Sequence, residues 1–203
     1  MVTRQQKINE MNVGFLSYEF PPKIFGGVGV HVTELARHLA ESIRQVHVFT
    51  SHVEGWDCQK AGSVYVHRSS KPLVTSSNRS SNASEKRTSN FNLNLNLNVP
   101  VMMKNYISSE TLDLLHSHGG LIQMAATEAK NMTHLPLVMS AHSTEINRVR
   151  PDNLSLLMEQ NVVGEVDRLI AVSRSMRTEM NRTFGIYYNT ITVIPNSVDS
   201  AVI

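Results

Sequence analysis

The sequence of 203 residues contains a single cysteine, Cys58, so it can build neither an internal disulfide framework nor a zinc site made of several thiolates. Charged residues are scarce as well, at 18% against roughly a quarter of an average globular chain. The formal net charge of +2 provides neither an acidic tail nor a strongly basic surface, which argues against a nucleic-acid-binding protein. The low cysteine content favours a reducing compartment, and we expect a cytoplasmic protein.

Long hydrophobic runs are also lacking. No apolar stretch reaches the ~18–20 residues that span a bilayer, so no transmembrane segment is predicted. Residues 1–10 are polar and lack the apolar centre of a signal peptide, and we expect them to form a disordered lead-in. A hydrophobic content of 41% over this length still supplies a substantial core for one large domain.

One internal segment is of low complexity. Between residues 76 and 90, ten of fifteen residues are Ser, Thr or Asn, and residues 92–98 alternate Asn with Leu. The first composition buries too little apolar area to offset its ordering entropy, whereas the alternation would suit a strand with one buried face. We expect a disordered surface insertion over about residues 75–98.

The rest of the chain alternates short apolar runs with helical periodicities. The runs predict strands at 12–17, 46–50, 63–67, 114–118, 137–142, 168–172 and 190–194, and helices are predicted over about 32–43, 101–112, 121–131, 154–162 and 174–184. Ser173 and Gly185 predict the start and the end of the last helix. This alternation predicts an α/β fold, a doubly wound, Rossmann-like parallel sheet whose ligands gather at the carboxyl ends of the strands.

The first predicted helix is amphipathic. Its apolar stripe contains Val32, Leu35, Ala36, Leu39, Ala40 and Ile43. His31, Glu34, Arg37, His38 and Glu41 fall on the opposite, polar face.

A glycine-rich loop joins the first strand to this helix. At Gly26, Gly27 and Gly29, small residues let the backbone approach a ligand, and free amides with the helix dipole favour an anion such as phosphate. A tight turn without a ligand is the alternative interpretation. Val32 stands where the dinucleotide fingerprint needs a third glycine, and the second strand ends without an acidic residue, which disfavours a nicotinamide-dependent oxidoreductase.

Histidines lie in or just after two predicted strands. His116 and His118 share one face of their strand, but apart from Asp113 no neighbouring ligand completes a metal site, so we expect no metal and a histidine lining a polar crevice. His142, at the end of the next strand, suits a hydrogen bond to a sugar hydroxyl or stabilisation of developing charge. The alternatives are that His142 bonds a neighbouring carbonyl and that Glu145 only begins a helix.

Taken together, these segments resemble family 4 glycosyltransferases, GT-B enzymes related to glycogen and starch synthases. The resemblance follows the chain from Met11 to Asp199 and rests on five motifs in order. These are the run from Ser17 through the glycine loop to Ala40, the strand ending in His116-Ser117-His118, the segment His142-Ser143-Thr144-Glu145, the pair Val172-Ser173, and the run Val193 to Asp199.

The resemblance implies that residues 11–198 form the amino-terminal, acceptor-side domain of a GT-B enzyme. Residues 199–203 would begin the linker to a C-terminal donor domain that binds a nucleotide-diphosphate sugar. Transfer in this family retains the configuration at the anomeric carbon and needs no metal and no other cofactor. A chain ending at Ile203 would hold at most half of such an active site, so we expect a fragment that is inactive alone.

The resemblance also implies roles for individual residues. Gly26, Gly27 and Gly29 would approach the donor diphosphate, and His142 would lie against the transferred sugar as the catalytic residue. His118 would bind substrate on the acceptor side. Glu145 and Asn196 would also bind substrate, and Asn196 would mark the crossing into the second half. Two departures from the family pattern are Ser197, where glycine is usual, and Phe25, where glycogen synthases have a lysine that here is displaced to Lys23.

A hypothesis of a different class is a stand-alone module that binds a glycan or a phosphate without catalysis. Because family members that act on lipid-linked acceptors sit at membrane surfaces, peripheral membrane association is compatible with the resemblance. The sequence specifies neither the sugar and nucleotide of the donor nor the acceptor, which would be a glycan, a lipid or a small molecule.

Overall fold

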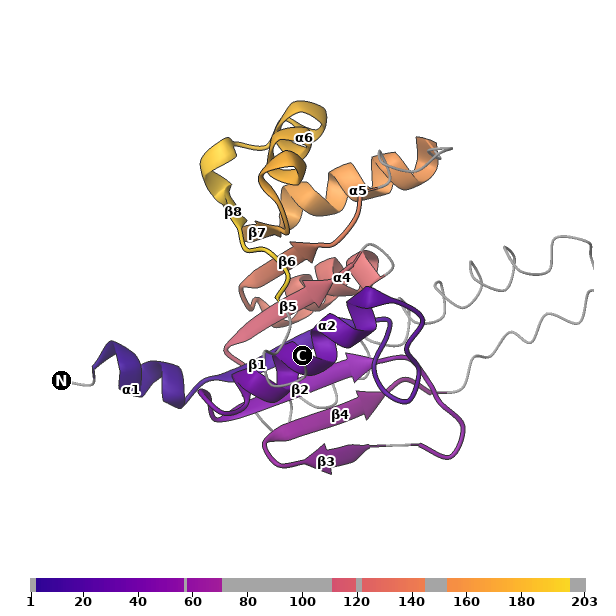
Figure 1. The fold of residues 1–203 in the computed structure, drawn as a ribbon, viewed down its shortest axis with the longest axis vertical. Helices are drawn as coiled ribbons and strands as arrows, with labels where there is room; N and C mark the ends of the chain where they lie inside the picture. Colours follow the sequence, from indigo (N-terminus) through magenta and orange to yellow (C-terminus); the bar gives the residue numbers. More distant parts are fainter. Residues whose placement is uncertain (1–2, 57, 71–110, 120–121, 145–152, 198–203) are drawn as a thin grey trace, which may run out of the picture.

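The protein is described here from a computed structural model, which places residues 3–56, 58–70, 111–119, 122–144 and 153–197. The strands form one eight-stranded sheet in the order β3-β4-β2-β1-β5-β6-β7-β8 (Figure 1). They are β1 (Asn12–Ser17), β2 (Gln45–Thr50), β3 (Gln59–Ala61), β4 (Val64–Arg68), β5 (Leu114–His118), β6 (Leu137–Ala141), β7 (Arg168–Ala171) and β8 (Ile191–Val193). All pairings are parallel except β3 with β4, which is antiparallel.

Helices cover both faces of this sheet. They are α1 (Arg4–Asn9), α2 (Gly27–Leu39), α4 (Gln123–Thr133), α5 (Asn153–Glu165) and α6 (Arg174–Phe184), followed by a short 3-10 helix, η3 (Tyr188–Thr190). Neighbouring residues of β1 point to opposite faces: Phe15 packs in a core cluster with Val32 of α2, whereas Leu16 packs in another with Ala126 of α4. The predicted doubly wound α/β fold is thereby confirmed.

The carboxyl-terminal third has its own core cluster and well-defined helix ends. Met176 and Met180 of α6 are buried against Leu169 of β7, as expected of methionines that fill a core. The Ser173 hydroxyl accepts a hydrogen bond of 3.1 Å from the backbone N–H of Met176, and α6 ends at Gly185 with a φ of 65°. Both predicted ends of this helix are confirmed.

The amino end differs from the expected disordered lead-in over residues 1–10. Residues Arg4–Asn9 form α1, because Thr3 and Gln6 make a capping box. The Thr3 hydroxyl accepts from the Gln6 N–H at 3.2 Å, and the Gln6 side chain accepts from the Thr3 N–H at 2.8 Å. Ile8 then packs, partly buried, against the core cluster of β1 and α2, which attaches the helix to the domain.

Three further expectations need adjustment. Helix α2 starts at Gly27, earlier than predicted, and ends at Leu39, so Ile43 is buried beyond it. Strand β3 was not predicted because its residues are exposed and carry no apolar alternation. The expected insertion over 75–98 lies outside the described residues, as does the helix predicted over 101–112 apart from its last two positions, which are not helical.

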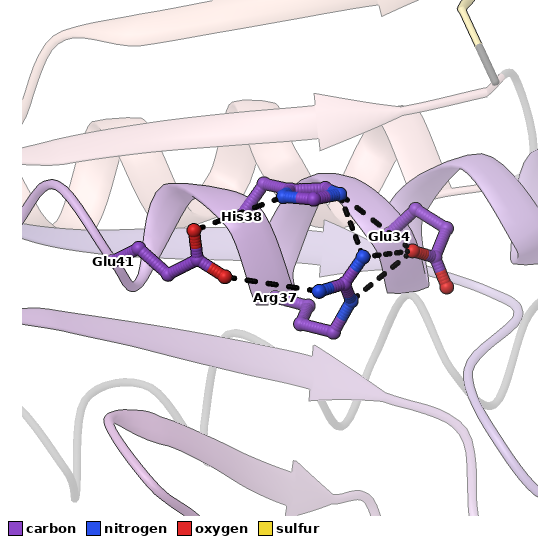
Figure 2. Close-up of polar contacts among 4 residues, drawn as sticks. All are labelled: Glu34, Arg37, His38 and Glu41. Carbon is purple, nitrogen blue, oxygen red and sulfur yellow. Dashed lines mark hydrogen bonds and ion pairs between the residues drawn. The ribbon is translucent and has the colours of Figure 1, made fainter. Parts of the chain in front are cut away.

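The outer face of α2 carries a small network of ion pairs (Figure 2). Arg37 lies 2.9 Å from a carboxylate oxygen of Glu34 and 3.7 Å from one of Glu41, and His38 approaches both acids at 3.9 Å. Exposed pairs of this kind contribute at most about 1 kcal/mol each. The predicted polar face is confirmed at these four positions.

Among the described residues, none of the helices combines the length and the apolar character that crossing a membrane requires.

Candidate functional site

Three neighbouring strands end side by side at one rim of the sheet. Ser17 of β1 is paired with His118 of β5, and His118 is paired with Ser140 of β6. His142 follows β6 directly, so it lies at the same rim as His118. The expectation that polar residues at the carboxyl ends of the strands would meet is confirmed for these two histidines.

Four imidazoles gather at this rim. The ring centroids of His116 and His118 are 4.1 Å apart, and those of His118 and His142 are 5.8 Å apart. His31, from the first turns of α2, lies 4.7 Å from His142 and 5.8 Å from His118. The ring of Phe15 packs edge-on against His118 at 4.9 Å and forms the floor of the cluster.

His31 was placed on the polar face of α2, and no part in the site was predicted for it from the sequence. In the structure its side chain is half-buried and contacts the rings of His118 and His142. His31 precedes Leu35 by four residues, one helical turn, so it borders the buried stripe. Its place at the amino end of α2, directly after the glycine loop, was the signal in the sequence that could have identified it.

The imidazoles differ in their hydrogen bonding. The Nε2 atom of His116 lies 2.9 Å from the Ser140 hydroxyl, which fixes this ring against β6. His118 is fully buried, yet neither of its ring nitrogens has a hydrogen-bond partner among the described residues, and the same holds for Nε2 of His142. Buried polar atoms are almost always satisfied, so these nitrogens indicate a place where a ligand atom binds.

Burial and mutual repulsion keep the cluster uncharged. Burial, followed by the proximity of other histidines, lowers the pKa of His116 to about 3 and that of His142 to about 4. The same causes lower the pKa of His118 well below its ordinary value, and burial alone lowers that of His31. Each neutral imidazole has one N–H donor and one nitrogen acceptor, so at neutral pH the site offers hydrogen bonds without positive charge.

The glycine loop approaches the same rim. His31 lies one turn after Gly27 in α2, and a side chain at Gly119, just past β5, would meet Val28 of α2. The loop and His142 therefore belong to one site. Its amides are not all free, however: one carboxylate oxygen of Glu19 accepts from the backbone N–H of Phe25 at 2.8 Å and of Gly26 at 2.9 Å.

The three glycines have different surroundings. Gly26 and Gly27 are exposed, and a Cβ atom at either would meet nothing within 4 Å, so both face open space where a ligand can approach. Gly29 is buried, and a Cβ there would lie 2.7 Å from a Glu19 carboxylate oxygen and 3.1 Å from Ile24. Close packing of α2 on the loop therefore explains Gly29, and its predicted contact with a ligand stays a prediction.

Two cationic side chains flank the loop. Arg68, at the end of β4, donates to the backbone carbonyl oxygens of Pro21 and Ser51 and so ties the loop to the sheet. Lys23 lies over the ring of Tyr18, 5.4 Å from its centroid. Burial, together with the charge of Arg68, lowers the pKa of Lys23 to about 8. A negatively charged ligand at this end of the sheet would favour the charged form of Lys23 and so raise its pKa again.

The two other predicted site residues stay predictions. Asn196 is exposed and lies just beyond edge strand β8. Glu145 lies outside the described residues.

Comparison with known proteins gives a consistent family assignment. The family model of Glycosyltransferase Family 4 matches residues 25–202. The α-maltose-1-phosphate synthase of Mycobacterium tuberculosis is 30% identical over 200 residues, covering 94% of this chain and 45% of the relative. The glycogen synthase of the same organism is 27% identical over 209 residues, covering 94% of this chain and 49% of the relative. The chain thus spans about half the length of the curated relatives it matches.

Solved structures agree at the level of the fold. Sucrose-phosphate synthase from Thermosynechococcus elongatus superposes with a TM-score of 0.70 at 16% identity, covering 92% of this chain and 48% of that one. The catalytic domain of starch synthase IV from Arabidopsis thaliana, bound to ADP and acarbose, gives 0.63 at 12% identity, covering 95% and 52%. The sheet described here therefore has the Rossmann-like fold of a GT-B amino-terminal half.

Proposed function

The chain belongs to Glycosyltransferase Family 4, and from that premise we propose that it forms the acceptor-side domain of a retaining glycosyltransferase. The reaction moves a sugar from a nucleotide-diphosphate sugar to an acceptor glycan, lipid or small molecule and releases the nucleoside diphosphate. The observation that carries the proposal is the meeting of His142 with the first turns of α2, where the His31 and His142 rings lie 4.7 Å apart.

In this proposal the reacting sugar lies at the rim of the sheet, between the backbone of the glycine loop and the histidines. The exposed backbone of Gly26 and Gly27 approaches the donor diphosphate, since nothing within 4 Å fills the space beside either glycine. His142 contacts the transferred sugar, and His118 lies deeper, on the acceptor side. Glu145 and Asn196 keep the substrate-contacting roles that the family resemblance implies.

His142 acts here as a neutral hydrogen-bonding group. With its pKa lowered to about 4, the imidazole is uncharged at neutral pH, so it positions a sugar hydroxyl by donating or accepting a hydrogen bond. Stabilisation of the transition state by a positioned donor of this kind is worth about 100-fold or more in rate. We propose that a second domain carries the donor, which fits the length of the curated relatives, about twice that of this chain.

The test compares the chain alone with the chain joined to a donor domain. The 203-residue chain is assayed for release of UDP or ADP from UDP-glucose or ADP-glucose, with glucans and sugar phosphates as acceptors. The same assay is run after fusing it to the carboxyl-terminal half of a family 4 relative. We expect no turnover by the chain alone and sugar transfer by the fusion.

Two outcomes contradict the proposal. Clear turnover by the chain alone would show that it needs no donor domain. A correctly folded fusion that binds glycan tightly and never transfers sugar would instead favour a binding module without catalysis.

A further inference from the structure

Three of the rim histidines have the arrangement of a metal-ligand set. One nitrogen from each of His31, His118 and His142 can be chosen so that all three atoms lie within 4.8 Å of one another. In tetrahedral coordination, with metal–nitrogen distances of about 2.0–2.1 Å, neighbouring nitrogens are about 3.3 Å apart. To bind a metal the three nitrogens have to come closer together, and this movement falls on His31 and His142, which are only half-buried, whereas His118 is buried.

The unsatisfied nitrogens provide a second, independent observation. His118 is 1% exposed, and both of its ring nitrogens lack a hydrogen-bond partner in the described part of the chain. Nε2 of His142 is in the same condition. Such atoms carry a desolvation cost unless something binds them. A cation held between the three rings satisfies one nitrogen of each.

The ligand chemistry selects the class of metal. Neutral imidazoles bind zinc, cobalt, nickel and copper, whereas magnesium and calcium prefer oxygen ligands, and the three-residue cluster contains no carboxylate. His116 does not belong to this set of three, and its Nε2 lies 2.9 Å from the Ser140 hydroxyl.

We propose that His31, His118 and His142 form a three-histidine site for a divalent transition metal of the zinc type, with its open coordination position toward the glycine loop. The sequence had indicated no metal because His116 and His118 had no third ligand nearby in the chain, and the fold supplies it from α2 and from the end of β6. Because the same imidazole of His142 contacts the sugar in the proposed function, a bound metal competes with sugar transfer. This consequence rests on the proposed function.

Cobalt binding by the full chain tests the site without any assay of activity. Co²⁺ is titrated into the protein carrying Cys58→Ser, since the thiol lies 4.0 Å from Nδ1 of His67 and could bind metal by itself. Tetrahedral Co²⁺ has strong visible absorption bands. We expect such bands to saturate at one equivalent and to disappear when Zn²⁺ is added, because both ions accept the same tetrahedral site.

Substitutions locate the bound metal. His31→Asn and His142→Asn should each weaken Co²⁺ affinity at least about tenfold, since removal even of outer-shell partners costs 10–100-fold. His38→Asn on the exposed face of α2 and His67→Asn on β4 are the matched controls and should leave the titration unchanged. Circular dichroism at each step confirms that the variants are folded.

Several results would overturn the proposal. They are the absence of tetrahedral bands with the folded protein, a titration that His31→Asn and His142→Asn do not alter, and bands abolished by His67→Asn or His38→Asn. Failure of the fusion enzyme to transfer sugar would affect the proposed function alone, because the cobalt spectrum does not depend on turnover.

Discussion

At the scale of single residues, the protein concentrates buried imidazoles beneath the amino end of α2. His116 and His118 belong to β5, and their rings contact each other. The ring of His31, which belongs to α2, contacts those of His118 and His142. Each of these rings is held neutral by its surroundings. The chemistry of such a cluster suits neutral hydroxyl groups or a divalent transition metal, and its lowered pKa values predict that the fold is sensitive to acid.

Acid should destabilise the protein well above the pH at which carboxylates titrate. The pKa of His116 is about 3 in the folded state and about 6.5 in an unfolded chain, so between these values the unfolded state binds more protons. The unfolding free energy therefore falls as pH falls, by up to about 2 kcal/mol for this residue between pH 7 and pH 5. Urea denaturation at the two pH values measures the difference.

The variant His116→Asn tests the source of that acid sensitivity. It should reduce the difference in unfolding free energy between pH 7 and pH 5 by up to about 2 kcal/mol, since asparagine does not titrate. His47, whose pKa is lowered to about 4 by burial and by His67, contributes with the same sign. So do the other three rim histidines, whose pKa values are also lowered, and together these groups should remain as the residual slope. An unchanged difference in the variant would mean that His116 is not the titrating group.

The glycine loop offers a matched pair of substitutions. Gly29→Ala places a methyl group 2.7 Å from a Glu19 oxygen that two backbone N–H groups hold in place, so it should destabilise the fold by about 1–3 kcal/mol. Gly27→Ala meets open space and should leave stability unchanged or raise it by about 0.5–1 kcal/mol. Thermal denaturation of both variants measures this contrast.

The two glycine variants also separate packing from ligand contact. In the fusion enzyme, Gly27→Ala should weaken use of the donor although the fold is intact, because its methyl group stands where the diphosphate is proposed to approach. Equal stability of the two variants would contradict the packing explanation for Gly29.

At the scale of elements, local signals in the sequence predicted most of the structure. Strand β1 is a short buried run, and α6 is bounded by Ser173 and Gly185, so burial and helix-end chemistry defined both. Helix α1 was missed although its capping box, Thr3 with Gln6, can be recognised in the sequence. Strand β3 could not be predicted, because only its pairing with β4 makes this exposed segment a strand.

Removal of the cap of α6 should have a measurable cost. Ser173→Ala deletes the hydroxyl that accepts from the Met176 N–H, and loss of such a cap costs about 1 kcal/mol, within a range of 0.5–2. For a domain of this size the melting temperature should fall by about 2–4 °C. Ser173→Asp keeps a cap acceptor and serves as the control. A melting temperature unchanged in Ser173→Ala would show that the cap contributes nothing.

At the scale of the whole molecule, the fold brings together residues that lie more than a hundred positions apart. The rule that parallel strands end at one rim correctly predicted that His118 and His142 would meet, whereas His31 was only placed on the polar face of its helix. The position of His31 depends on how α2 crosses the sheet, which the pattern along one helix does not contain. The same limit applies to Glu19, whose contact with the loop amides requires the folded loop.

The central claim is that His142 and the glycine loop meet a sugar donor carried by a second domain. The most direct measurement is the rate of nucleoside diphosphate release by the fusion enzyme with His142→Ala, with His38→Ala on the outer face of α2 as control (Figure 2). The account predicts a loss of about 100-fold or more for His142→Ala and an unchanged rate for the control. Full activity of a folded His142→Ala fusion would contradict it.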